Sequence, residues 1–141
     1  QSFAFADGVV TASFGSATAK AHADTLFTEE DEDNELGTEG EVKIEGLKTN
    51  LIRTVKKQAA GILQDTDWYI VRKADASTAV PSAITTFRAA VRSKGAAMET
   101  LITNASNTPA IETLYTYVNT ADEGDPVVME RPLGEFPELG S

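Results

Sequence analysis

The chain has 141 residues, a length that fits one ordinary domain, and 41% of them are apolar. It contains no cysteine, which excludes disulfide scaffolds, thiolate metal sites and cysteine nucleophiles. The formal net charge of −10 argues against general affinity for nucleic acids or anionic membranes, and the sequence lacks the run of roughly 18 apolar residues that indicates a transmembrane helix.

Charge is distributed unevenly along the chain. Residues 48–94 hold nine basic and three acidic residues, whereas the remaining residues hold three basic and nineteen acidic ones. A basic middle between acidic ends is compatible with head-to-tail contacts between copies, with neutralisation inside one fold, or with a solvated surface of mixed charge.

The N-terminal residues predict a β-hairpin. Large and small residues are interleaved on both sides of Asp7 and Gly8, and an Asp-Gly pair is typical of a two-residue type I′ turn. We therefore expect strands near 2–6 and 9–14. An isolated hairpin is marginal in water, so it should pack on a helix or pair with another chain.

A short helix and an acidic linker are predicted next. Ser16 is suited to capping a helix over 16–27. Seven of the twelve residues at 29–40 are acidic and none is basic, so self-repulsion predicts an extended or mobile linker. This linker separates an N-terminal segment, residues 1–28, from a helical domain over 41–120.

The helical domain is expected to contain two long amphipathic helices. Apolar residues recur every three or four positions over 41–64 and again over 81–104. Pro81 suits the first helical position of the second helix. The aromatic and β-branched run at 68–71 indicates a short strand, or an extended link pinned by Trp68.

A third, shorter helix and an extended tail complete the chain. Thr108 is the expected N-cap of this helix, with Pro109 at its first position. Residues 121–141 contain three prolines and three glycines and predict an extended tail, in which Phe136 and Leu139 can anchor the chain to a neighbour. The predicted fold class is α+β, mainly α: an N-terminal hairpin, a small helical body with two longer helices, and an extended C-terminal tail.

The residue types needed for catalysis or metal binding are sparse. His22 is the only histidine, so a zinc site or a serine triad would lack its ligands or its base. The acidic run fails the EF-hand pattern because Leu36 stands where the loop needs Gly and Val42 where it needs Glu. No phosphate-binding glycine motif is present. We expect no enzymatic activity, no catalytic residue, no metal and no cofactor.

Two neighbouring segments carry a resemblance to a known family. Residues 63–68 read Leu-Gln-Asp-Thr-Asp-Trp, and residues 81–92 follow the form Pro-x-x-Ile-x-x-Phe-Arg-x-Ala-Val-Arg. Together they resemble the C-terminal module of tailed-bacteriophage tail-fibre assembly and tail-associated proteins. There a Ser/Thr-Asp-Trp turn precedes a helix reading Tyr-Arg-x-Ala-Leu-Arg. Phe87 and Val91 replace the usual Tyr and Leu.

The resemblance implies a role in phage assembly. The expected function is a non-enzymatic virion structural protein of the tail or its fibres. It would assemble in the host cytoplasm and be present as a homo-oligomer or in several copies, bound to other phage structural proteins. The family's assembly chaperones lack the five residues inserted after Trp68, the hairpin and the Pro-rich tail, and these additions favour a part that stays in the particle.

Three alternatives stay open. The first is a transient tail-fibre assembly chaperone, and the second is a head-decoration or connector protein. The third is a module that binds single-stranded nucleic acid, because Trp68, Tyr69, Arg72 and Lys73 combine rings for stacking with positive charge; the overall negative charge disfavours it.

Contacts with other proteins are expected to involve aromatic and arginine residues of the central segment and apolar residues of the tail. Trp68 is predicted to fill the gap between the two long helices. Arg88 and Arg92, four residues apart, are predicted to share one helix side and to meet acids on a neighbour. The interface candidates are Trp68, Tyr69, Arg72, Phe87, Arg88, Arg92, Phe136 and Leu139.

Overall fold

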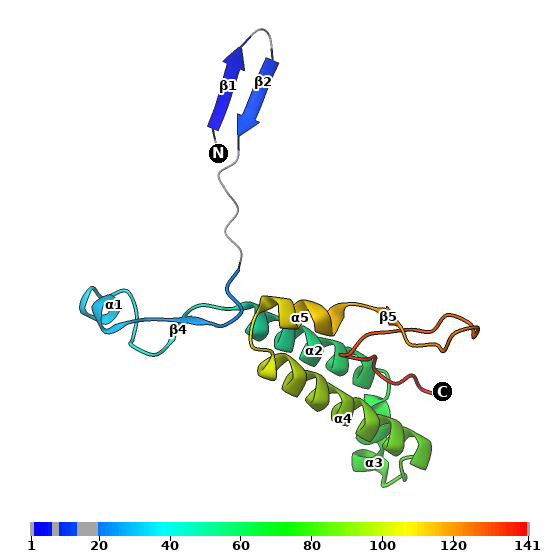
Figure 1. The fold of residues 1–141 in the computed structure, drawn as a ribbon. Helices are drawn as coiled ribbons and strands as arrows, with labels where there is room; N and C mark the ends of the chain where they lie inside the picture. Colours follow the sequence, from blue (N-terminus) through cyan, green and yellow to red (C-terminus); the bar gives the residue numbers. More distant parts are fainter. Residues whose placement is uncertain (1, 7–8, 14–19, 141) are drawn as a thin grey trace.

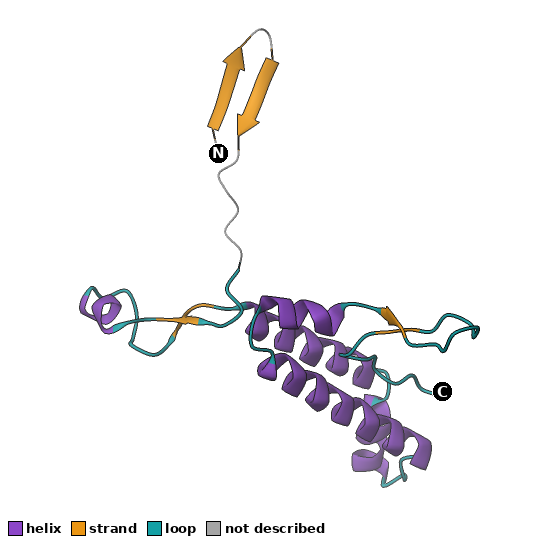
Figure 2. Cartoon of the chain, viewed as in Figure 1, coloured by secondary structure: helices purple, strands orange, loops and turns teal. Residues whose placement is uncertain are grey.

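The computed structural model describes residues 2–6, 9–13 and 20–140, with side chains from residue 20 onward (Figure 1). Most of the regular structure is α-helical, and the strands form antiparallel two-stranded sheets (Figure 2). The predicted fold class, mainly α with an N-terminal hairpin, is confirmed.

The strands of the N-terminal hairpin lie where they were predicted, except that the second is described only to Ser13, one residue earlier than its predicted end. Strand β1 (Ser2–Ala6) pairs antiparallel with β2 (Val9–Ser13), and Ala6 lies opposite Val9. This pairing leaves two residues between the strands, as a two-residue turn requires. The turn residues Asp7 and Gly8 lie outside the described residues.

The helix predicted over 16–27 is wrong for the residues that the structure describes. Residues 20–24 form a loop, and β3 (Thr25–Leu26) pairs with β4 (Val42–Ile44). Residues 14–19, with the predicted cap, lie outside the described part of the chain. The backbone N–H of Phe27 donates to the carbonyl of Glu41 over 2.9 Å, so this segment is held by a partner strand rather than by its own helical turns.

The acidic stretch, predicted to be extended or mobile, contains the short helix α1 (Glu29–Asp33). Thr28 caps it reciprocally: the Thr28 hydroxyl accepts from the Asp31 N–H, and the Asp31 carboxylate accepts from the Thr28 N–H. Acids in a first turn are favoured by the helix dipole, which offsets part of their mutual repulsion. Asp31 also pairs with Lys43 of β4 over 2.6 Å.

The two long helices lie side by side and run in opposite directions (Figure 1). Helix α2 (Leu47–Gln64) begins six residues later than predicted, because β4 occupies the segment before it. Helix α4 (Ser82–Asn104) matches its prediction, with Pro81 as N-cap rather than first helical residue. The central core side chains, each at most 2% exposed, are Val55, Met98, Ile102 and Leu133.

The strand or extended link predicted at 68–71 is wrong, because these residues lie in helix α3 (Asp67–Ala76). Their β-branched and aromatic character does not override the helical hydrogen bonding of a segment that packs against the end of α2. No helix within the described ranges is long and apolar enough to cross a membrane.

The C-terminal part is more ordered than an extended tail. Helix α5 (Thr108–Tyr115) is capped by Asn107, whose side-chain oxygen accepts from the Ala110 N–H over 2.9 Å, so the cap lies one residue before the predicted one. Strands β5 (Val118–Asn119) and β6 (Met129–Glu130) then form a ribbon. Leu133 returns to the core and donates its N–H to the carbonyl of Leu114.

Candidate functional site

The buried guanidinium of Arg88 joins α4 to the turn between α2 and α3. Its Nη1 donates to the carbonyl of Leu63 over 2.8 Å and to the hydroxyl of Thr66 over 2.7 Å. Its Nη2 forms an ion pair with Asp67 over 2.8 Å. Arg88 is 7% exposed and Thr66 is 2% exposed, so the centre of the network is internal, whereas the Asp67 side chain lies at the surface. The predicted surface role of Arg88 is therefore wrong, because its guanidinium is bound to other residues of the same chain.

Arg92 does not share this role. It lies one turn further along α4 and is exposed, with no ion pair or hydrogen bond to any residue that the structure describes. Of the two predicted arginines, Arg92 alone has a side chain available to a neighbour.

The outer surface of α3 presents a cluster of aromatic and basic side chains, Trp68, Tyr69, Arg72 and Lys73, which we call the α3 face. The Trp68 and Tyr69 ring centroids are 3.9 Å apart. The guanidinium carbon of Arg72 lies 4.7 Å from the Trp68 centroid and 5.4 Å from the Tyr69 centroid, within cation–π range. Lys73 is exposed, and the Nε of Arg72 is buried beside the rings without a hydrogen-bond partner in the described part of the chain.

The prediction that Trp68 fills the gap between the long helices is wrong, because half of its surface is exposed. The helical register explains this. Asp67 turns toward Arg88, so the side chains at the next position and one turn later, Trp68 and Arg72, lie on the outward side of α3. A strand reading of this segment could not place Trp68 and Arg72 together, whereas their i, i+4 spacing does so in a helix.

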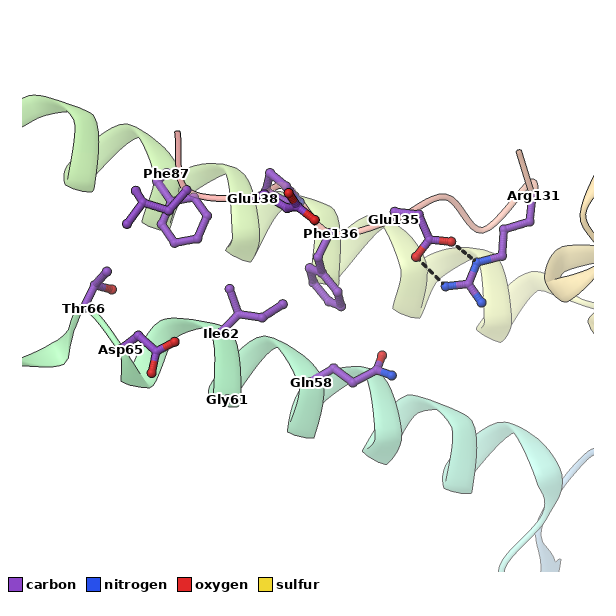
Figure 3. A pocket seen from close by; sticks show the side chains of 12 residues that line it. Gln58, Gly61, Ile62, Asp65, Thr66, Phe87, Arg131, Glu135, Phe136 and Glu138 are labelled. Atoms are coloured by element: carbon purple, nitrogen blue, oxygen red, sulfur yellow. Dashed lines mark hydrogen bonds and ion pairs between the residues drawn. The ribbon is translucent and has the colours of Figure 1, made fainter. Parts of the chain in front are cut away.

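A pocket of about 740 Å³ lies between the tail and the two long helices (Figure 3). Phe87 and Phe136, both interface candidates, line it together with Ile62. Phe136 packs against Gly95 of α4, where a Cβ would lie 3.6 Å from the Phe136 ring and 3.7 Å from the Cβ of Ala59. Phe87 and Phe136 therefore pack within the chain.

The edge of this pocket carries acidic groups, Asp65, Glu135 and Glu138. Glu135 pairs with Arg131 over 2.7 Å and accepts from the Tyr117 hydroxyl. The Tyr117 hydrogen bond, with help from Arg131, lowers the pKa of Glu135. Leu139 also lines the pocket and is 54% exposed, so of the two tail candidates it has the more accessible side chain.

No group of three or more His, Asp or Glu side chains that could hold a metal ion is present within the described ranges. His22 contributes its backbone instead: its carbonyl accepts from the Lys48 N–H at the start of α2.

Comparison with known proteins gives no match: no family model, no curated protein and no solved structure is significantly similar to the chain.

Proposed function

We propose that the chain is a non-enzymatic structural protein of a bacteriophage particle, a tail or tail-fibre component that binds other phage proteins in several copies. The proposal rests on the resemblance over residues 63–92 and on how the fold uses the residues that carry it.

The observation that supports the proposal most is the Arg88 network. Thr66 and Asp67 belong to the first resembling segment and Arg88 to the second, and the Arg88 side chain contacts both of the others. The two segments therefore pack together through a buried arginine, which supports treating them as one motif. The next residue of the pattern, Trp68, is left on the surface and is available for contact.

Exposed apolar side chains on three separate surfaces support a role inside an assembly. They lie on α3, on the β3–β4 ribbon and on the β5–β6 ribbon, and both ribbons are exposed at every strand residue. Two-stranded ribbons gain little stability alone in water, and contiguous exposed apolar surface is typical of interaction sites. The side chains concerned include Leu26, Val42, Ile44, Ile70, Val71, Val118, Val127 and Met129.

The test is quantitative mass spectrometry of purified particles of the encoding phage. We expect the chain at a fixed copy number relative to the tail proteins, after washing in high salt. Presence in infected cells but absence from particles would contradict the proposal and favour a transient tail-fibre assembly chaperone. Co-purification with isolated heads rather than tails would favour a decoration or connector protein.

A further inference from the structure

The α3 face has the composition of a protein-binding hot spot. Trp, Tyr and Arg are the residue types that dominate such sites. Here the two rings and the guanidinium of Arg72 already contact one another in the single chain, before any partner binds. Half of the Trp68 side chain is exposed, and the neighbouring Val71 is 65% exposed. Arg72 and Lys73 make no ion pair with another described residue. The face therefore fits a partner that offers carboxylates around an apolar side chain.

The acidic arm, residues 24–46, has this chemistry. It contains ten acidic residues and one basic residue. Asp31 and Glu45 are neutralised by Lys43 and Arg53, but six acids have no ion pair or side-chain hydrogen bond among the described residues. In their midst the side chain of Leu36 is 62% exposed. The six free acids are Glu29, Glu30, Asp33, Glu35, Glu39 and Glu41.

The arm is joined to the body by contacts at its base, and it points away from that body. The Asp24 carboxylate accepts from the Gly46 N–H over 2.6 Å and from the Thr49 hydroxyl, and Glu45 pairs with Arg53. Figure 1 shows α1 and β4 projecting from one end of the helical body, while α3 lies at the other end. The arm of one chain therefore cannot reach the α3 face of the same chain.

We propose that the acidic arm of one copy docks on the α3 face of a second copy. The acids would face Arg72 and Lys73, and Leu36 would pack against the exposed Trp68. Because two different surfaces meet, the contact is head-to-tail, and it builds a ring or a filament according to whether the rotation between copies closes. The proposal goes beyond the function proposed above and does not depend on a phage setting.

The β5–β6 ribbon is a poor competitor for the arm, although it is also exposed and apolar. Its loop and strands carry four acidic residues and no basic one, so the two would repel each other. Its acidic residues are Asp122, Glu123, Asp125 and Glu130.

Sedimentation velocity of the full chain over a range of concentrations tests the proposal. We expect self-association that weakens as NaCl is raised from about 0.05 M to about 0.5 M, because salt screens the facing charges. One variant reverses the charges of the α3 face (Arg72→Glu with Lys73→Glu), and a second reverses two charges of the acidic arm (Glu35→Lys with Glu39→Lys). Each should raise the dissociation constant for self-association by at least roughly tenfold. Lys57→Glu, at an exposed position of α2, is the matched control and should leave it unchanged.

Mixing the two variants gives the decisive measurement. Each retains one intact half of the contact, so an equimolar mixture should form 1:1 heterodimers although each variant alone is monomeric. Circular dichroism establishes that both variants are folded. A monomeric parent chain, or a mixture that stays monomeric with both variants folded, would overturn the proposal. Equal loss of association with Lys57→Glu would also overturn it, since the effect would then come from net charge alone.

Discussion

At the scale of single residues, Arg88 joins α4 to the turn between α2 and α3. It donates to the Leu63 carbonyl and to the Thr66 hydroxyl, and it pairs with Asp67. We expect Arg88→Ala to lower the free energy of unfolding by about 3 kcal/mol, because it removes a buried side chain together with its hydrogen bonds and its ion pair. Arg92→Ala, one turn away and exposed, should change it by less than about 0.5 kcal/mol. Urea denaturation of both variants checks the contrast, and similar losses would mean that the Arg88 network contributes no more than surface charge.

Trp68 illustrates the opposite case, a large apolar residue that contributes little to the fold. A Trp that fills a core costs about 3–5 kcal/mol when truncated to Ala, and the sequence alone suggested that role. Half of the Trp68 surface is exposed, and the ring contacts that the described residues show are with neighbours on α3. We expect Trp68→Ala to cost at most about 1 kcal/mol, since stacking and cation–π contacts at an exposed site contribute little. Thermal unfolding measures this, and a loss as large as that of Arg88→Ala would show that the ring is buried in solution.

At the scale of elements, the start of α2 is held by the loop before it. Its N-cap is Gly46, which has no side chain to cap the helix, and backbone carbonyls of Ala21 and His22 accept from the first helical N–H groups. A Cβ at Gly46 would lie 2.3 Å from the backbone of Ala23, so the helix and the loop can approach only at a glycine.

This close approach predicts opposite effects for two glycines of the same helix region. Gly46→Ala should destabilise the fold by about 2 kcal/mol or more, because backbone atoms would have to move apart. Gly61→Ala, with no atom within 4 Å of the added Cβ, should stabilise it by about 1 kcal/mol through helix propensity. Chemical denaturation of the two variants gives the sign of each effect. Stabilisation by Gly46→Ala would mean that the loop does not lie against α2.

The Asp24 carboxylate, which accepts hydrogen bonds from Gly46 and Thr49, should make the stability of the start of α2 depend on pH in acid. Hydrogen bonds from the Thr49 hydroxyl and then the Gly46 N–H lower the pKa of Asp24 below its ordinary value of 3.8. A carboxyl whose folded pKa is depressed stabilises the fold above its ordinary pKa, and this contribution is lost as pH falls through the folded value. The difference in unfolding midpoint between the parent chain and Asp24→Ala should therefore be constant well above pH 3.8 and shrink below it.

Glu123→Ala is the control for this titration, since the Glu123 side chain is exposed and has no hydrogen bond to another described residue. The difference in unfolding midpoint between Glu123→Ala and the parent chain should stay near zero over the whole pH range. A difference for Asp24→Ala that persists unchanged in strong acid would show that the ionised carboxylate is not what holds the loop.

How far sequence predicts these elements depends on whether local signals and tertiary contacts agree. The periodic apolar residues of α2 and α4 predicted both helices, because the side chains that form the apolar stripe of each helix are also the ones that pack into the core. The prediction for residues 68–71 was wrong, since β-branched and aromatic residues suggest a strand, whereas these residues lie in a helix whose first residue, Asp67, pairs with the distant Arg88. Arg88 itself was expected on the surface, because nothing local reveals that a distant turn would supply its acceptors.

At the scale of the whole molecule, the C-terminal segment is part of the core rather than a free extension. Its proline and glycine content predicted an extended path, and the described residues after β6 form neither helix nor strand. The content did not predict that this path returns to the core. Leu133 lies between the two long helices at 2% exposure, and Phe136 follows it against Gly95. The same segment forms one wall of the pocket, so the shape of that pocket depends on the tail staying docked (Figure 3).

Docking of the tail predicts a contrast between two leucines six residues apart. Leu133→Ala removes a fully buried side chain that contacts the centre of the core, and we expect a loss of about 3 kcal/mol in the free energy of unfolding. Leu139→Ala, at a position that is 54% exposed, should cost less than about 1 kcal/mol. Equilibrium unfolding in urea provides both values, and limited proteolysis of the Leu133→Ala chain should cut first beyond β6, where the tail has lost its anchor. If the two substitutions cost the same small amount, the tail is not docked in solution, and the helix pair must be stable without it.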